Sequence, residues 1–169
     1  LTRQNQRVNM LKTLYDALQS MCNELSYDCQ PFQQAYEKVK ELDYQHAFIH
    51  GKLKSAPNRQ HKAGVHIRVE EEYAAISALI QDKEGHEAGR VELLRTLPHY
   101  MFIYQFIRHT KWLDKDRFQV SDKSGQVAFV ADIESQQASM QVQPQKGQSL
   151  AEVLGELKNA LPETNTLQP

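Results

Sequence analysis

Residues 99–113 read HYMFIYQFIRHTKWL and hold a nearly uninterrupted run of large apolar side chains. A helix that is apolar on almost every side is expected at the centre of a fold. We therefore predict a central helix over residues 99–113, with Phe102 and Phe106 buried and Trp112 as its last large anchor.

The segments before this run have the spacing of helices. From Val8 to Leu25 the apolar side chains fall three and four positions apart, which indicates one face of a helix. A second helix is expected to begin at Pro31 and end near His50, and the short loop between the two predicts an antiparallel hairpin. A short strand follows at residues 65–69, and two further helices are expected over residues 70–82 and 86–97.

After residue 113 the apolar pattern changes to strict alternation. Three short alternating runs between Phe118 and Val142 predict a three-stranded antiparallel meander with one buried face. Ser149 and Glu152 have the spacing of a capping box, which predicts a final helix that stops at Pro162. The expected fold class is therefore α+β and mostly helical, with a single domain over residues 1–162 and a polar tail over 163–169.

Composition excludes several classes of protein. The chain has 169 residues, with 20 Lys and Arg against 21 Asp and Glu, for a net charge of −1. This balance excludes a globally basic nucleic-acid binder and an acidic solvating tail. No stretch approaches the roughly 18 apolar residues of a membrane helix, so we expect no membrane insertion.

The residues that often carry chemistry form no complete catalytic or metal-binding set. His46 and His50 are four positions apart on the second predicted helix, but Ala47 stands where a metalloprotease has glutamate. Asp132 and Glu134 share a strand face without further carboxylate partners. We therefore expect no metal and no cofactor, and we lean against an enzyme.

The two cysteines leave two alternatives open. Cys22 and Cys29 lack the CxxC spacing of a metal or redox site. They could form one disulfide in an oxidising compartment. Alternatively, Cys22 is a small buried hydrophobe on the apolar stripe of the first helix.

A basic segment is the sharpest local feature of the sequence. The segment from Lys52 to Arg68 carries several Lys and Arg side chains and contains no Asp or Glu. Such a segment favours binding to phosphate groups, because binding releases counterions. The alternative is a solvated loop whose charges balance the glutamates at 70–72. The candidate nucleic-acid-binding residues are Lys52, Lys54, Arg59, His61, Lys62, His66 and Arg68.

The order of the elements predicted over residues 65–97 resembles that of a known DNA-binding fold. A strand at residues 65–69 followed by two helices resembles the ribbon-helix-helix arrangement of small bacterial repressors, in which strand side chains enter the major groove. The alternation within residues 65–69 predicts that His66 and Arg68 point outward. The apolar run after Pro98 is too long for that small fold, and we assign no family.

Two functions follow from these features. The first is a non-catalytic, DNA-binding accessory or regulatory domain that contacts phosphates through the basic segment. The second is a protein-interaction domain of a larger or membrane-anchored protein, which docks through the Val8–Leu25 helix. We expect a cytoplasmic protein, or a periplasmic domain if a membrane anchor precedes residue 1.

Overall fold

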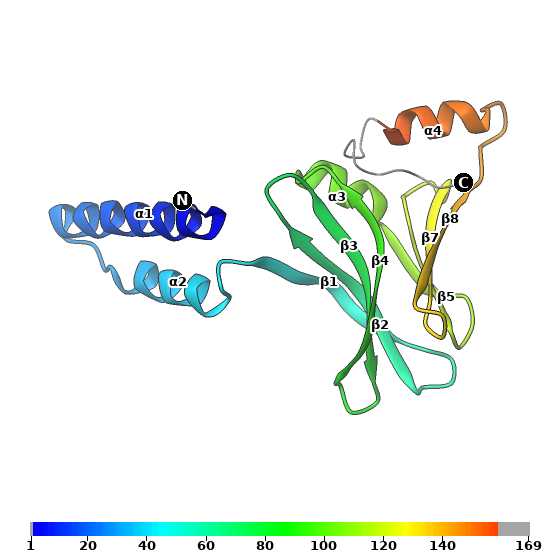
Figure 1. Ribbon diagram of the computed structural model, residues 1–169, viewed down its shortest axis with the longest axis horizontal. Coiled ribbons are helices and arrows are strands. Elements are labelled where there is room, and N and C mark those ends of the chain that lie inside the picture. The colour runs from blue at the N-terminus through cyan, green and yellow to red at the C-terminus, as the bar shows by residue number, and fades with distance from the viewer. Residues whose placement is uncertain (1, 159–169) are drawn as a thin grey trace. The chain divides into compact units, whose positions relative to one another are not determined.

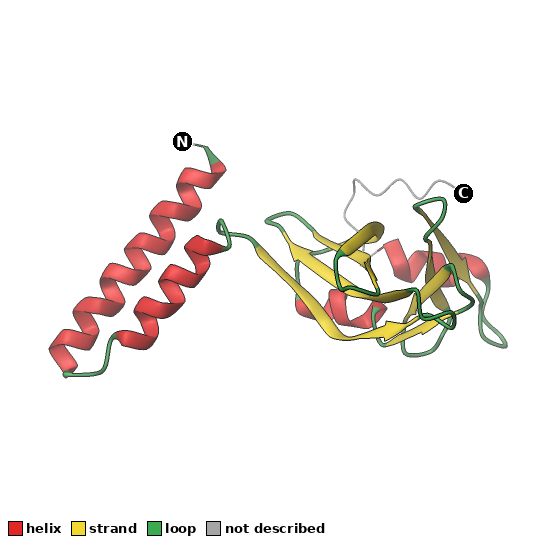
Figure 2. Cartoon of the chain, turned by 90° about the horizontal axis from the view of Figure 1, so that it is seen from below, coloured by secondary structure: helices red, strands yellow, loops and turns green. Residues whose placement is uncertain are grey.

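The computed structural model describes residues 2–158 and divides the chain into two compact units, Leu1–His46 and Ala47–Pro169. The first unit consists of two helices (Figure 1). The second unit contains two β-sheets and two further helices, and we call it the strand-rich unit (Figure 2).

The first unit is the predicted helical hairpin, formed by α1 (Arg3–Leu25) and α2 (Gln30–Glu41). The Thr2 side chain caps α1 by accepting a hydrogen bond from a backbone N–H of the first turn. Between the two helices, Tyr15 and Tyr36 stack with their ring centroids 4.2 Å apart. The pairing of α1 with α2 therefore rests in part on aromatic contact.

The strand-rich unit contains two four-stranded sheets, and in each sheet the strands follow one another in chain order. The first sheet consists of β1 (His46–Ser55), β2 (His61–Val69), β3 (Ala74–Asp82) and β4 (Glu87–Thr96). The second sheet consists of β5 (His109–Trp112), β6 (Arg117–Ser121), β7 (Val127–Asp132) and β8 (Gln137–Val142).

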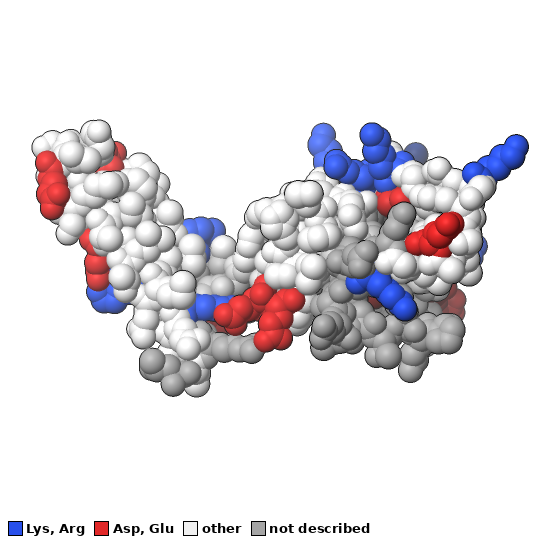
Figure 3. Space-filling view, turned by 90° about the horizontal axis from the view of Figure 1, so that it is seen from above, with Lys and Arg blue, Asp and Glu red and all other residues white. Residues whose placement is uncertain are grey.

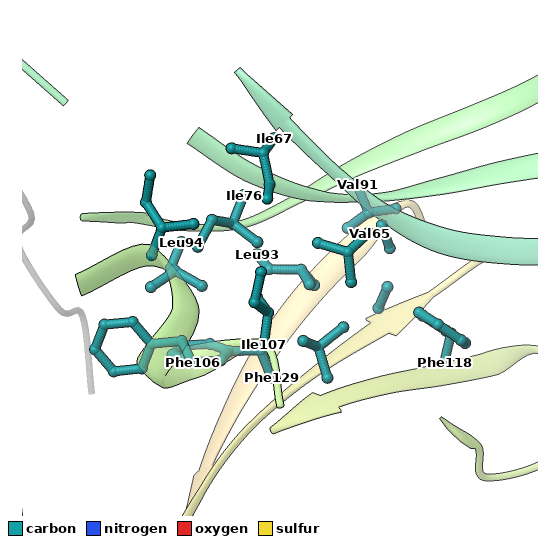
Figure 4. Packing of buried hydrophobic residues seen from close by; sticks show 14 of the residues in the cluster. Val65, Ile67, Ile76, Val91, Leu93, Leu94, Phe106, Ile107, Phe118 and Phe129 are labelled. Carbon is teal, nitrogen blue, oxygen red and sulfur yellow. The ribbon is translucent and has the colours of Figure 1, made fainter. Parts of the chain in front are cut away.

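The two sheets share one hydrophobic core (Figure 4). Val65 and Ile67 on β2 alternate with polar neighbours, so both side chains reach the side of the sheet that faces the core. Phe118 and Phe129 enter the same core from the second sheet. Phe118 is fully buried and meets the Trp112 ring edge to face, with centroids 5.4 Å apart.

Two hydrogen bonds join an edge of the first sheet to an edge of the second. The Trp112 indole Nε1 donates to the backbone oxygen of Lys54 at 2.8 Å, and the Lys54 Nζ donates to the backbone oxygen of Thr110 at 2.5 Å. Strands β1 and β5 therefore lie next to each other. Pairing of this kind protects sheet edges that would otherwise offer unpaired backbone groups.

Two helices complete the strand-rich unit. The short α3 (Tyr100–Phe106) connects the sheets, and α4 (Leu150–Lys158) buries Val153 and Leu157 in the shared core. The predicted capping box of α4 is confirmed. The Ser149 amide donates to a Glu152 carboxylate oxygen at 2.7 Å, and the amide of Glu152 donates to the Ser149 hydroxyl at 3.2 Å.

The prediction of a mostly helical fold with a three-stranded meander is wrong. Residues 2–158 form eight strands in two sheets, and both segments predicted as helices over 70–82 and 86–97 are strands. Strand β3 is buried on both faces from Ala74 to Ile80, so its apolar residues follow one another without alternation. Such a run resembles a buried helix. Residues 65–97 therefore lack the strand–helix–helix order of a ribbon-helix-helix protein.

Irregular pairing explains the error at β4. The register of β3 against β4 shifts between Ile76 and Ser77 and again between Ile80 and Gln81. A shift of this kind places neighbouring residues such as Leu93 and Leu94 both in the core. The apolar residues of β4 therefore do not follow strict two-residue alternation, and their spacing resembles the three-and-four spacing of an amphipathic helix.

Two other predicted helices are shorter than expected. The helix from Pro31 ends at Glu41, and β1 occupies residues 46–55. The helix predicted over residues 99–113 is limited to α3, and the last part of that segment forms β5, the first strand of the second sheet. Phe106 is buried as predicted, whereas Phe102 is half-buried and packs against the edge of the core.

Candidate nucleic-acid interface

The outer face of the first sheet carries two residues that the sequence singled out. His66 and Arg68 lie on the face of β2 opposite to the core, as the alternation predicted. Next to them is a hollow of about 190 Å³. We call this site the basic hollow, and it is lined by His66, Arg68, Ala75, Ser77, Arg90 and Glu92.

Small side chains on the middle strand create the hollow. On β3, Ser77 lies opposite His66 of β2, and Ala75 lies opposite Arg68. Because Ala75 and Ser77 are short, the longer side chains of β2 and β4 rise around them. On the other side, Ser77 is paired with Glu92 of β4. The hollow therefore has a nearly neutral floor and charged walls.

Arg90 stands on the β4 side of the hollow. Its guanidinium makes two hydrogen bonds with the Glu87 carboxylate, Nε to Oε1 at 3.0 Å and Nη2 to Oε2 at 2.7 Å. Its Nη1 lies 3.3 Å from Nε2 and 3.4 Å from Nδ1 of His66. Arg90 therefore links β4 to β2 across the hollow while keeping its cationic group at the surface.

Burial lowers the pKa of His66 below its ordinary value of 6.5. The positive charge of Arg90 lowers this pKa further, Glu87 acts in the opposite direction, and Arg68 lowers it again. The imidazole is thus neutral at pH 7. An anion bound in the hollow would favour the charged form, so anion binding and proton uptake at His66 are coupled.

Arg68 stands on the β2 side and pairs with a carboxylate. Its Nε lies 3.3 Å from the Glu70 carboxylate, an ion pair with both side chains partly exposed. Within the described part of the chain, this Nε is buried and makes no hydrogen bond. Glu70 balances the charge of Arg68, and an anion bound in the hollow would compete with this carboxylate for the guanidinium.

The other candidate residues of the basic segment do not all share this face. Lys62 lies on the same side of β2 as His66, in line with the two-residue alternation. Lys52 and Lys54 lie on β1, where the ammonium of Lys54 is used in the bond to β5 described above. Arg59 lies in the β1–β2 turn, and His61 begins β2 with its Nδ1 buried.

The sequence reasoning missed the contributions of β3 and β4. Ser77, Arg90 and Glu92 fell in segments that were predicted to be helical, so nothing placed them beside β2. One signal could have found them. The run Asp82–Gly85 has turn composition between two apolar segments, which is typical of a β-hairpin.

The basic hollow belongs to a wider set of charged groups. On β4, the Arg95 guanidinium pairs with Glu92 at 2.8 Å and lies over the Tyr73 ring. Figure 3 shows Lys and Arg side chains of the strand-rich unit gathered along one border of the face it displays. Cations therefore cluster on part of this unit although the net charge of the chain is close to zero.

A larger cleft of about 370 Å³ lies between α3, the β6–β7 turn and α4. Its polar atoms hold the turn together, since Asp122 accepts from the Val127 amide and from the hydroxyl of Ser124. Arg108 and Lys123 stand among its lining residues. We favour the smaller hollow as the functional site because it brings His66 and Arg68 of the basic segment together with Arg90.

The histidine pair and the cysteines have structural positions. His46 and His50 lie on β1, where residues four apart are separated by about 13 Å, so they do not chelate a metal. In residues 2–158, no group of three or more His, Cys, Asp or Glu is placed to hold a metal ion. Cys22 and Cys29 are both free thiols, and Cys22 is buried as one of the two alternatives predicted.

Comparisons with known proteins give no further assignment. No protein-family model matches the chain, and it has no match among curated proteins or among solved structures. Over the described residues, no helix has both the length and the apolar character that crossing a membrane requires.

Proposed function

We propose that this protein is a non-catalytic, nucleic-acid-associated accessory domain that contacts phosphates through the basic hollow. One observation carries the proposal: Arg68 and Arg90 stand on opposite sides of a hollow with a floor of small residues, and the Nη1 of Arg90 lies 3.3 Å from His66 across it. Arginine suits phosphate because its planar guanidinium presents several N–H groups in a fixed fork.

The glutamates around the hollow do not oppose this function strongly. The ion pairs of Arg68 and Arg90 are partly exposed, with side-chain exposures of 42% and 39% for the arginines. Exposed ion pairs contribute about 0–1 kcal/mol. Exchanging a carboxylate for a phosphate oxygen therefore costs little, and releasing the counterions of the nucleic acid favours the exchange.

Salt dependence tests the proposal. Labelled duplex and single-stranded DNA are titrated with the full chain at three salt concentrations. If Lys62, Arg68 and Arg90 all contact phosphates, log K falls with log salt at a slope of about −3 on duplex DNA. The Arg68→Gln/Arg90→Gln variant loses about two units of that slope and weakens binding to every sequence alike.

A matched control removes the same charge elsewhere. Lys123 and Lys146 are exposed and lie outside the hollow. The Lys123→Gln/Lys146→Gln variant keeps the parental slope if the hollow is the site. Equal losses in both variants, or no binding by the parent at about 100 mM salt, contradict the proposal.

A nucleic-acid-associated role also implies a compartment. We place the protein in the cytoplasm, because its nucleic-acid partner is there and because both thiols are free. Mass analysis of the protein purified without reductant tests this. A Cys22–Cys29 disulfide in the purified chain would favour the periplasmic alternative.

A second candidate function is protein–protein interaction through α1. The observation that favours it is the exposure of large apolar side chains along this helix, which are Met10, Leu14, Met21 and Leu25. Contiguous apolar side chains on a surface are typical of interaction sites. This function does not compete with phosphate binding, because it uses the other unit of the chain.

A further inference from the structure

Helix α1 carries two apolar stripes side by side. The first stripe includes Tyr15 and Cys22, which are half-buried and buried, and it contacts α2 through the Tyr15–Tyr36 stack. The second stripe is exposed and is spaced by three and four residues, so it forms a continuous line along the helix. We call it the outer stripe, and it consists of Met10, Leu14, Ala17, Met21 and Leu25.

A hairpin that stood alone would need only the first stripe. A helix in a two-helix hairpin has one neighbour, whereas each helix of a four-helix bundle packs against two neighbours and has a correspondingly wide apolar arc. The outer stripe widens the apolar arc of α1 to the width that a second neighbour requires. Helix α2 repeats this feature, since Phe32 and Val39 are exposed on it and Leu42 is exposed at its C-cap.

We propose that the outer stripe pairs antiparallel with the outer stripe of a second copy of this chain, so that two hairpins form a four-helix bundle. This proposal names the partner of the docking surface assigned to α1 above and rests on that assignment. A two-fold axis requires a surface that is complementary to itself. The outer stripe meets this condition. With the axis beside Ala17, Met10 faces Leu25 of the second copy and Leu14 faces Met21.

The charges along α1 favour the antiparallel arrangement. Lys12 and Asp16 balance each other in an ion pair at 2.6 Å, whereas Arg7 lies in the N-terminal half of the helix and Glu24 in the C-terminal half, and both flank the outer stripe. Antiparallel pairing places Arg7 of one copy toward Glu24 of the other, and it also opposes the two helix dipoles. Parallel pairing would bring like charges together.

The apolar area is of the right order for a dimer. A stable dimer interface buries roughly 800 Å² on each partner. The hairpin exposes eight large apolar side chains, each with an exposed fraction between 36% and 73%, which together supply on the order of several hundred Å². These residues are Met10, Leu14, Met21, Leu25, Tyr27, Phe32, Val39 and Leu42.

Sedimentation of the full chain is the first test. We expect the parent to have the mass of a dimer at about 100 µM, since mass action favours the associated state at high concentration. The Met10→Lys/Leu14→Lys variant has the mass of a monomer, because it puts four charges into the paired stripes. The Asn9→Lys/Ser20→Lys control adds the same charge to exposed polar positions of α1 and remains a dimer.

Methionine oxidation is the second test and needs no substitution. Met10 and Met101 have almost equal exposed fractions, 73% and 74%, and Met101 lies on α3 in the other unit. Exposed methionines are oxidised by peroxide to the sulfoxide, with the oxygen supplied by the peroxide and water released. In the dimer, Met10 is oxidised several-fold more slowly than Met101, and dilution below the dissociation constant removes the difference.

The two tests together separate the proposal from the assignment on which it rests. A monomeric parent in which Met10 and Met101 are oxidised at equal rates overturns self-association but leaves α1 open for another protein. A monomeric parent in which Met10 is protected overturns both, because the outer stripe is then covered within the chain. A dimer that survives in the Met10→Lys/Leu14→Lys variant overturns the proposed interface.

Discussion

The two units of the chain differ in how they bury apolar surface. In the helical hairpin, Cys22 is the only buried hydrophobic residue that the structure describes, and every other one lies in the strand-rich unit. Two sheets can enclose a core between their inner faces, whereas two helices touch along one line. The strand-rich unit therefore supplies its own stability, and the hairpin needs a further neighbour to bury the rest of its apolar surface.

The largest expected difference between the units concerns core truncation. Phe106 is 2% exposed and meets Phe129 edge to face, so Phe106→Ala should cost about 3–5 kcal/mol of unfolding free energy. Because Phe102 is only half-buried, Phe102→Ala should lower the unfolding free energy by less than Phe106→Ala does. In the hairpin, Leu14→Ala removes an exposed side chain and should leave the stability of the strand-rich unit unchanged.

Trp112 makes this measurement specific. It is the single tryptophan of the chain, and it lies on β5 in contact with Phe118. Denaturant titrations followed by its fluorescence report on the strand-rich unit alone. A Phe106→Ala midpoint within error of the parent, or a Leu14→Ala midpoint far below it, would contradict the comparison.

Helix capping gives a smaller contrast. The hydroxyl of Ser149 caps α4, which packs on the shared core, so Ser149→Ala should lower the Trp112 unfolding midpoint by an equivalent of about 1 kcal/mol. Thr2 caps α1 in the hairpin, and Thr2→Ala should leave that midpoint unchanged. If both variants shift the Trp112 transition equally, the two units unfold as one.

Thiol labelling compares the units without a substitution. Burial raises the pKa of the Cys22 thiol, whereas Cys29 is partly exposed, so an alkylating reagent should modify Cys29 well before Cys22. Cys22 then reacts only when the hairpin opens, at a rate measured by mass spectrometry. We expect Cys22 to become reactive while Trp112 fluorescence is still native. If Cys22 reacted only when the Trp112 fluorescence changed, this would contradict the lower stability of the hairpin.

The sequence predicted the elements whose apolar spacing had one interpretation. The hairpin, the alternation of His66 and Arg68 on β2, the strands from Phe118 onward and the Ser149 cap all follow from local patterns. Local rules of this kind depend on one face being buried and the other exposed.

The rest depended on contacts between distant segments. Strand β3 is buried on both sides, so its continuous apolar run fits a helix or a strand equally well. The basic hollow depends on the register of β3 against β2 and β4, which sets Ser77 beside His66 and brings in Arg90. No spacing within one segment contains that register. Two of the six lining residues, His66 and Arg68, were therefore visible in the sequence, and the other four required the fold.

The smallest expected effect concerns pH and separates the basic hollow from the hairpin. The pKa of His66 is lowered in the folded state, chiefly by burial, from an ordinary value of 6.5. The unfolded chain therefore takes up the proton first as the pH falls. The stability contribution of neutral His66 is complete above about pH 6.5 and is lost as the pH falls through the lowered pKa. In the hairpin, carboxylate hydrogen bonds raise the pKa values of Lys12 and Lys40 above 10.5, so these groups stay charged throughout.

Urea midpoints of the parent and of His66→Gln, measured between pH 7.5 and pH 5, test this. The parent should lose more stability than the variant over that range, and the loss is small because His66 is only half-buried. Bound phosphate reverses the sign, since it favours charged His66, so DNA binding by the parent should strengthen as the pH falls while that of the variant changes less. If the parent and the variant had identical pH dependence in both experiments, protonation of His66 would affect neither stability nor DNA binding. An opposite sign for stability and for binding is the result that anion binding beside His66 predicts.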